Sequence, residues 1–308
     1  MTSQIKAVIV ADSCSAVNGK RITTFELEYP RFIHSELMTH RMFSRNAASS
    51  RAIPIEKMCD QVCDNPATPI HWGKNQAGMQ AKEQVGDVEL YAVRGLWEEQ
   101  AQQTSLVARY MAGHGLHKQI VNRILEPFQL MKTVVTATEW ENFFWLRKHE
   151  DAQPEIKELA ERMWEALGES KAVELKPGEW HLPYVSIGRD GKGNAVYFLK
   201  GQPDTFGGLE LDDALAISAS CCAQVSYRLL DDSIEKARKV YQRLVESEPV
   251  HASPFEHQVT PMKEPLQSDK YLWEDGMTHA DKDGNMWSGN LMGWIQHRQL
   301  IPNNVKRG

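Results

Sequence analysis

Residues 25–51, FELEYPRFIHSELMTHRMFSRNAASSR, contain the pattern on which the expected fold depends. Apolar and polar residues alternate like a strand from Thr24 to Glu28, and the alternation stops at Pro30, where a proline can open a helix. Apolar residues then recur at helical spacing as far as Met38. The segment therefore predicts a strand, a helix and then a stretch dense in hydrogen-bond donors. These donors are His40, Arg41, Ser44, Arg45, Asn46, Ser49, Ser50 and Arg51.

This collection of guanidinium groups, hydroxyls and an amide suits a polyanionic ligand. Arginine binds phosphate through two parallel hydrogen bonds, so a nucleotide phosphate or a cofactor pyrophosphate would fit it. The alternative interpretation is a solvated charged face, and composition alone does not separate the two.

Composition limits the classes of protein to consider. The chain has 308 residues with 42% hydrophobic content, enough for one large domain or two modest ones. A net charge of -6 and a pI near 6.0 argue against a general nucleic-acid binder but permit a local basic pocket for a mononucleotide. No apolar run reaches membrane-spanning length, and the first residues lack the apolar region of a signal peptide. We expect a cytoplasmic protein, in the host cytoplasm if viral, that binds neither membrane nor nucleic acid.

The five cysteines form no paired CxxC set, so reduced thiols are expected. Cys59 and Cys63 would share a helix face, but they lack a second ligand pair, and no metal site is predicted. Cys221 and Cys222 lie in an apolar helical pattern and are interpreted as packing residues. Neither a GxxxxGK[ST] nor a GxGxxG motif occurs, so a conventional dinucleotide-binding fold is not expected.

The rest of the chain predicts an α/β (α+β) fold in which strands alternate with helices. An Asn18-Gly19 turn should join strand 5–11 to the strand ending near Glu28, and 131–137 and 258–260 also resemble strands. Helices are expected at 55–63, 90–113, 117–125, 142–147, 154–167, 211–222, 232–246 and 291–300.

Within helix 90–113 the apolar pattern places four side chains toward the core. They are Leu96, Leu106, Val107 and Tyr110. The loop-rich segment 168–208 should connect a signature-bearing part, 1–167, to a C-terminal part, 209–308, within one integrated domain.

From His40 to Arg51 the spacing His-Arg-x-x-Ser-x-Asn-x-x-Ser-x-Arg resembles the signature of flavin-dependent thymidylate synthases, usually written Arg-His-Arg-x-x-Ser-x-Asn-Glu-x-Ser-x-Arg. The chain departs from that signature where Thr39 replaces the first arginine and Ala47 replaces the glutamate. Further stretches are similar to segments of the same family. They are 142–147 with 152–156, Arg123 ahead of Ile124-Leu125-Glu126-Pro127, and 251–257 (HASPFEH) with 224–227 upstream.

The order of these segments differs from the family's. The elements at 224–227 and 251–257 normally precede the signature, so the chain resembles a circularly permuted or rearranged member, as expected of phage genomes. Permutation leaves a packed core intact when the original termini lie close together. A duplication is the other possibility, because residues 294–298 faintly resemble the signature helix.

The resemblance implies an antiparallel or mixed sheet flanked by helices, the thymidylate synthase-complementing protein fold. It also implies a homotetramer in which FAD and dUMP bind where subunits meet. Methylenetetrahydrofolate would donate the carbon and NADPH the reducing equivalents for conversion of dUMP to dTMP. The protein's part would be orientation and electrostatics.

The resemblance also assigns roles to individual residues. The expected dUMP-binding residues are Ser49, Arg51, Arg123 and Arg147, of which Arg51 and Arg123 suit phosphate and Arg147 the pyrimidine ring. The expected catalytic residues are Arg147, His251 and Ser49. The expected FAD-binding residues are His40, Arg41, Ser44, Asn46, Asn142, Ser226 and Ser253.

Some of these residues have ordinary structural alternatives. His251 and His257 flank a proline turn and could be capping or core histidines. Arg147 could pair with Glu150 or Glu155, and Asn142 could be a surface residue of its helix.

Three other functions stay open. Glu36 stands where the family commonly has glutamine and Asp151 where it often has histidine, and an added carboxylate could favour cytosine. A hydroxymethylase or methylase of dUMP or dCMP is therefore one alternative, and a catalytically inactive nucleotide-binding relative is another. A cysteine-dependent thymidylate synthase is disfavoured, because no cysteine lies in a recognisable nucleophile context.

Overall fold

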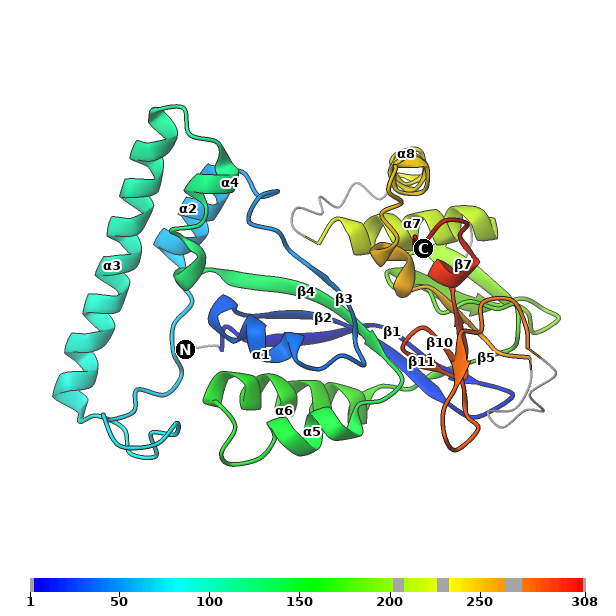
Figure 1. Cartoon of the computed structure of the whole chain (residues 1–308), viewed down its shortest axis with the longest axis horizontal. Coiled ribbons are helices and arrows are strands. Elements are labelled where there is room, and N and C mark those ends of the chain that lie inside the picture. Colours follow the sequence, from blue (N-terminus) through cyan, green and yellow to red (C-terminus); the bar gives the residue numbers. More distant parts are fainter. Residues whose placement is uncertain (1–2, 202–207, 226–232, 264–272, 307–308) are drawn as a thin grey trace.

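The computed structural model describes residues 3–201, 208–225, 233–263 and 273–306. Its centre is a five-stranded mixed sheet in the order β3-β4-β2-β1-β5 (Figure 1). The strands are β1 (Lys6–Ser15), β2 (Arg21–Pro30), β3 (Ser44–Ala47), β4 (Leu130–Ala137) and β5 (Val173–Leu175). All neighbours pair antiparallel except β5, which runs parallel to β1.

The predicted hairpin is confirmed. β1 and β2 pair from Lys6 opposite Glu28 to Cys14 opposite Arg21, with a bulge between Ile9 and Ala11. Gly19 closes the turn at a φ of +69°, a conformation that glycine adopts without the steric cost of a side chain.

Helices cover one face of the sheet completely. α5 (Glu141–Arg147) and α6 (Pro154–Glu169) pack there against a core that includes Phe25 and Val135. Because side chains alternate along a strand, Thr24 and Thr136 point to the opposite face.

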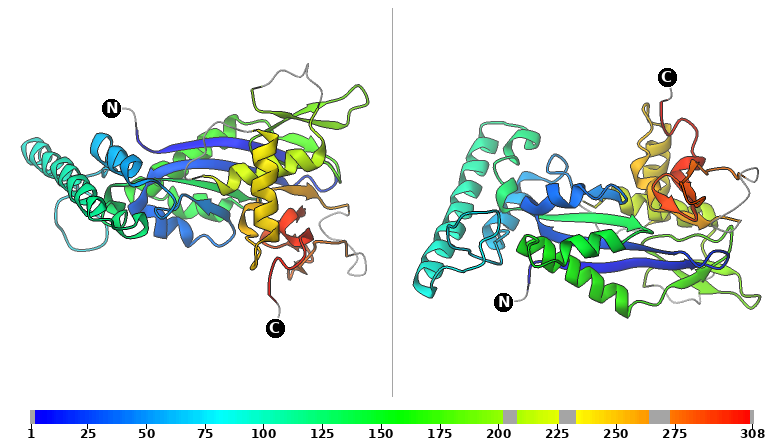
Figure 2. Two further views of the ribbon diagram at one scale, coloured as in Figure 1. Left: turned by 90° about the horizontal axis from the view of Figure 1, so that it is seen from above. Right: turned by 60° about the horizontal axis from the view of Figure 1, so that its bottom comes forward.

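The C-terminal part packs on that opposite face. α7 (Leu211–Ala223) lies against the sheet and α8 (Ile234–Glu246) covers α7. Their core joins Val134 of β4 to Trp180, Leu182 and Ile217. Figures 1 and 2 show the two helical layers on either side of the strands. The expectation of a mixed sheet flanked by helices is confirmed.

Three helices form a separate layer at the end of the sheet where β4 begins. They are α2 (Ile55–Asp64), α3 (Asp87–Gly113) and α4 (Lys118–Val121), which is shorter than the helix predicted at 117–125. The core-facing assignment in α3 was wrong, because Leu96, Leu106, Val107 and Tyr110 are exposed. The buried face is the opposite stripe of Ala101, Ser105 and Ala108, so α3 has apolar residues on two faces.

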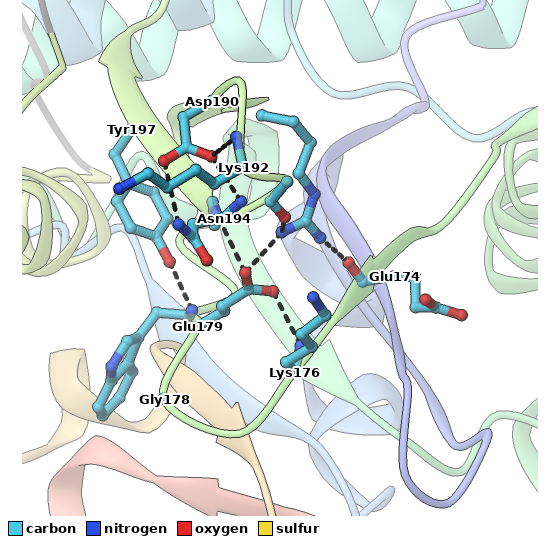
Figure 3. Close-up of polar contacts among 12 residues, drawn as sticks. Glu174, Lys176, Gly178, Glu179, Asp190, Lys192, Asn194 and Tyr197 are labelled. Atoms are coloured by element: carbon cyan, nitrogen blue, oxygen red, sulfur yellow. Dashed lines mark hydrogen bonds and ion pairs between the residues drawn. The ribbon is translucent and has the colours of Figure 1, made fainter.

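The segment 168–208 contains more regular structure than its glycines suggested. β6 (Val185–Arg189) and β7 (Ala195–Leu199) form a hairpin. The Glu179 carboxylate accepts from the backbone N–H groups of Lys176 and Ala195 and from Arg189, at 2.6–2.9 Å (Figure 3). These contacts hold the loop from Lys176 to Leu182, here called the strap, so that Trp180 and His181 lie against the sheet.

The closing helix predicted at 291–300 was wrong. The chain there forms β11 (Leu291–Met292), β12 (Trp294–Gln296) and a short α9 (His297–Leu300). Gly293 between the strands has a φ of +73°, which breaks any helix. β12 pairs with β8 (Val259–Pro261), and β10 (Met286–Ser288) pairs with both β9 (His279–Ala280) and β11.

Phe25 tests the packing of the main core. Its side chain is fully buried, and its ring centroid lies 5.2 Å from that of Trp140. Phe25→Ala should lower the free energy of unfolding by about 3–5 kcal/mol, because a large cavity replaces the ring. Val8→Ala on the exposed side of the same hairpin should change it by no more than about 0.5 kcal/mol. Urea denaturation measures both, and equal losses would contradict this assignment of the core.

Candidate functional site

The predicted donor-rich segment is spread along β4 rather than gathered in one loop. Helix α1 (His34–Met38) ends before it, and the segment then continues as strand β3. Ser44 lies opposite Thr136, and the backbone N–H of Ala48 donates to Lys132 O at 2.8 Å. His40 and Arg41 therefore lie toward the end of β4, whereas Ser49 and Arg51 lie toward its beginning.

Arg147 is fixed at the first of these ends by three contacts. Its guanidinium donates to Glu36 Oε2 at 2.9 Å, to His40 Nε2 at 2.9 Å and to Thr39 Oγ1 at 3.3 Å. The alternative pairing with Glu150 or Glu155 on the following segment is not the one that forms. Glu36, the carboxylate that could favour cytosine, forms an ion pair with Arg147.

His40 is the acceptor in this cluster and must be unprotonated at Nε2. Burial and the nearby charges of Arg147 and Arg45 lower its pKa to about 4. Arg45 in turn donates to the carbonyls of Met38 and His40 at 2.8 and 3.2 Å, so it stabilises the turn. Neutral His40 and paired Arg147 thus form a rigid unit at neutral pH.

A depression of about 180 Å³ adjoins this unit. Among its lining residues are Thr39, His40, Arg41, Asn142 and Arg147. Arg41 is exposed, and no residue of the described part pairs with it. Sites for drug-sized ligands occupy about 300–1,000 Å³, so this depression is smaller than a typical site of that kind.

A second polar cluster lies at the other end of β4. Glu126 Oε1 accepts from Ser50 at 2.7 Å and forms ion pairs with Arg123 at 2.8 Å and Arg31 at 3.1 Å. Arg51 is exposed beside this cluster, with no ion pair to any described carboxylate. Ser50, which lies between Ser49 and Arg51 in the sequence, is therefore linked to Arg123 through Glu126, whereas Arg147 belongs to the other cluster.

Asn122 organises this second cluster and was not identified from the sequence. Its fully buried amide donates to the carbonyls of Ser50 and Ile53 at 2.7 and 2.9 Å. A buried donor pair of this kind fixes the loop that carries Arg51. No spacing rule points to it, because the contact joins residues about seventy positions apart.

The HASPFEH segment reaches the signature from the C-terminal part. Within it, η4 (Ser253–Glu256) packs against β3, and His257 Nε2 lies 3.3 Å from Asn46 Oδ1. With its amide nitrogen turned to that side, Asn46 donates to Arg45 O at 3.0 Å and Ser253 O at 3.2 Å. Residues some two hundred positions apart therefore meet at β3.

The remaining predicted residues occupy different environments. His251 is exposed, whereas its neighbour His257 is a fully buried core histidine. Ser44 is also buried and donates to Asn290 at 3.1 Å. Ser226 lies outside the described residues.

Metal binding and membrane insertion find no support in the described part of the chain. Among those residues, no group of three or more histidine, cysteine, aspartate or glutamate side chains could hold a metal ion. No helix there is long and apolar enough to cross a membrane. Cys221 and Cys222 are buried thiols, as the packing interpretation expected, and Cys59 is buried as well.

The fold and the two clusters define a mixed α/β protein that presents arginines and hydroxyls at both ends of one central strand. Residues 21–170, just under half of the chain, match the model of the family described as thymidylate synthase complementing protein. The matched segment contains the whole signature region, from His40 to Arg51. No curated protein sequence matches the chain.

Solved structures give distant matches. A UMP/dUMP methylase, PolB from Streptomyces cacaoi, bound with 5-Br UMP, is 19% identical with a TM-score of 0.41, over 54% of this chain and 89% of that one. ThyX from Helicobacter pylori with FAD and dUMP is 16% identical with a TM-score of 0.32, over 47% of this chain and 67% of that one.

Buried histidines predict a loss of stability in acid. Burial lowers the pKa of His40, His181 and His297 to about 4 and that of His257 to about 3, from 6.5. Above pH 6.5 these histidines are neutral in both states, so their contribution is fully present. Between pH 6.5 and 4 only the unfolded chain binds protons, so the free energy of unfolding falls as pH falls, by at most about 1.4 kcal/mol per pH unit for each histidine.

Urea titrations at several pH values measure this slope. His257→Gln should remove one histidine's share of it between pH 6.5 and 4 while keeping an amide in the same space. A slope unchanged in that variant would contradict a neutral, buried His257.

Proposed function

We propose that this protein is a flavin-dependent enzyme that converts dUMP to dTMP by reductive methylation. The observation that carries the proposal is the meeting of HASPFEH with Asn46 of the signature. The family match ends at residue 170, yet a block similar to the same family outside that match packs onto the signature strand. The contact brings two segments that resemble the same family to one place in the fold.

The cluster around Asn122 suits the nucleotide phosphate. Arg51 is exposed and unpaired among the described residues, and Arg123 is half exposed beside Glu126. A phosphate there would receive guanidinium donors from Arg51 and Arg123 and the hydroxyl of Ser49, and charge-assisted hydrogen bonds of this type are the strong ones.

Arg147 suits the pyrimidine ring. Three of its five N–H groups are engaged by Glu36, Thr39 and His40, which leaves two to donate to a ring carbonyl. A donor held rigidly near a carbonyl stabilises the negative charge that develops on the ring during attack, without having to reorganise. Neutral His40 keeps the guanidinium in place by accepting from Nε.

The residues around the depression fit a flavin. Arg41, exposed and without an ion pair among the described residues, suits an anionic pyrophosphate. Asn142 and His40 add polar groups to a lining that also contains apolar Phe143 and the carboxylate of Glu139, which pairs with Lys20. The proposed FAD-binding residues also include Asn46, Ser253, Ser44 and Ser226. When bound, FAD carries reducing equivalents from NADPH to the carbon that methylenetetrahydrofolate transfers. Exposed His251 is free to order water or substrate near the reacting carbon.

The complete site requires more than one copy of the chain. Arg123 lies just before β4, next to α4 at the end of the sheet where β4 begins, whereas Arg147 lies after β4 on α5, which packs on one face of the sheet; Figure 1 shows α4 and α5 well apart. One copy therefore does not place both arginines on one nucleotide. A homotetramer in the cytoplasm, with sites between subunits, completes the proposal.

The outer face of α3 supplies a surface for such assembly. Tyr91 and Tyr110 are 85% and 70% exposed, and Val88 and Leu106 lie on the same stripe of the helix. Exposed Glu99, Gln102 and Gln103 separate Val88 and Tyr91 from Leu106 and Tyr110, so the stripe offers two small apolar patches for association rather than a continuous one.

A methylase or hydroxymethylase of dCMP is the second candidate. Glu36 touches Arg147, so a carboxylate lies beside the proposed pyrimidine position and could accept from the exocyclic amine of cytosine. Asp151 adds nothing to this idea, because it lies near exposed His149 instead.

The first test is an absorbance spectrum with FAD, followed by product analysis with methylenetetrahydrofolate, NADPH and either dUMP or dCMP. We expect bound flavin and dTMP. Arg51→Ala should lower kcat/KM for dUMP by about 10- to 100-fold, the effect of losing a charged hydrogen bond. The matched control is Arg109→Ala, an arginine of α3 paired with Glu56 and Asp60.

Three outcomes separate the candidates. Turnover of dCMP, with preference shifted toward dUMP by Glu36→Gln, would favour the second candidate. Nucleotide binding without flavin binding would indicate an inactive relative. Equal loss of activity in Arg51→Ala and Arg109→Ala would remove Arg51 from the site.

A further inference from the structure

A continuous chain of buried hydrogen bonds crosses the central sheet and ends at the signature. Ser13 Oγ lies 2.9 Å from His181 Nδ1, and His181 Nε2 lies 2.8 Å from Thr24 Oγ1. Thr24 Oγ1 lies 2.7 Å from Thr136 Oγ1. His257 then joins Thr136 to Asn46, with Nδ1 at 2.8 Å from Thr136 Oγ1 and Nε2 at 3.3 Å from Asn46.

Its interior members are sealed from solvent and come from separate elements. Thr24, Thr136, His181 and His257 are completely buried, and Ser13 is 1% exposed. Thr24 and Thr136 are directly opposite each other on β2 and β4, which places both hydroxyls on the face covered by the C-terminal part. His181 lies two residues after Glu179, whose carboxylate contacts are shown in Figure 3.

The chain has only two self-consistent directions. Burial lowers the pKa of both histidines far below 7, so each ring has one N–H donor and one bare nitrogen acceptor. Each threonine hydroxyl has one hydrogen for two neighbours, so it must donate to one and accept from the other. Every bond in the chain therefore points toward Asn46, or every bond points toward Ser13.

The direction is coupled to the Asn46 amide. If the chain points toward Asn46, His257 Nε2–H requires the amide oxygen on its side. If it points toward Ser13, His257 carries its proton on Nδ1, and bare Nε2 accepts the amide nitrogen on its side. In that orientation the same nitrogen also donates to Arg45 O and Ser253 O, which would otherwise face the amide oxygen.

We propose that Thr24, Thr136 and His181 are positioning residues that, through the Nδ1–H tautomer of His257, turn the Asn46 amide oxygen toward bound flavin. The oxygen then lies on the side away from His257 and accepts from an N–H group of the flavin ring. This role of Asn46 rests on the proposed function, whereas the direction of the hydrogen bonds does not.

Ring ¹⁵N NMR of the ¹⁵N-histidine-labelled full chain tests the direction, because the two nitrogens of a neutral imidazole are distinguished by which one is protonated. We expect the His257 proton on Nδ1. In Thr24→Val the Thr136 hydroxyl loses its acceptor on β2 and donates to His257 instead, so the proton should move to Nε2. Thr24→Ser keeps the hydroxyl and should keep the Nδ1 tautomer. A wild-type His257 protonated on Nε2, or a tautomer unmoved by Thr24→Val, would overturn the proposal.

Equilibrium titration with FAD tests the consequence. Thr24→Val should weaken FAD binding about tenfold, the effect of one misdirected hydrogen bond, while Thr24→Ser restores it. The matched control is Thr23→Val, which removes a buried hydroxyl from the next position of β2, where Thr23 donates to Asp12 on the other face. Equal weakening in Thr23→Val and Thr24→Val would refute the positioning role.

Two provisions keep the outcomes distinct. If Thr24→Val does not fold, Ser13→Ala removes the hydroxyl at the far end of the hydrogen-bond chain. It should shift the His181 tautomer while leaving the hydroxyls of Thr24 and Thr136 in place. If wild-type protein binds no FAD, the proposed function and the role of Asn46 toward flavin both fail, while the tautomer measurements still decide the direction.

Discussion

The antiparallel pairing of β2 with β4 determines which side chains of these strands face each of the two layers that cover the central sheet. It runs over eight pairs, from Thr23 opposite Ala137 to Pro30 opposite Leu130. Alternation along these strands sends Phe25 and Val135 to the α5 and α6 layer, and Thr24 and Thr136 to the C-terminal part. A slip of one residue would exchange the two faces and bury threonines in the aromatic core.

The two faces are held by different forces. The α5 and α6 face is an apolar core with aromatic pairs such as Phe25 and Trp140, whose stabilisation grows with buried area. The other face also buries hydroxyls and histidines, which cost free energy unless each finds a partner. The chain from Ser13 to Asn46 provides those partners and ties the C-terminal part to the signature strand in one register.

Much of this could be predicted from the sequence, because local patterns decide local structure. The hairpin through Gly19, the strand at 130–137 and the amphipathic α6 were predictable from alternation, turn residues and helical period. The stripe of α3 that faces the core could not be predicted. Two faces of this helix carry apolar residues, and the helical period alone does not show which of them is buried. The helix prediction for residues 291–300 failed because the apolar pattern there suits helix and strand alike, and Gly293 at positive φ does not fit a helix.

The candidate site could likewise be predicted only in part. Its residue types followed from the signature, but its contacts join distant positions, such as Glu36 to Arg147 and Asn122 to Ser50, and no spacing encodes them. Nor does the signature reveal that it is stretched along β4. That geometry appears only when β3 pairs with β4, and it separates the proposed phosphate residues from the proposed pyrimidine residue within one copy.

The central claim is that a complete site takes Arg123 and Arg147 from different copies of the chain. Co-expression of Arg123→Ala with Arg147→Ala, each carrying a different affinity tag, tests it directly. Each variant alone should be inactive, whereas doubly purified mixed assemblies should form dTMP, because some sites then combine both intact arginines. Mixed assemblies as inactive as the single variants would contradict the account and place both arginines in one copy's site.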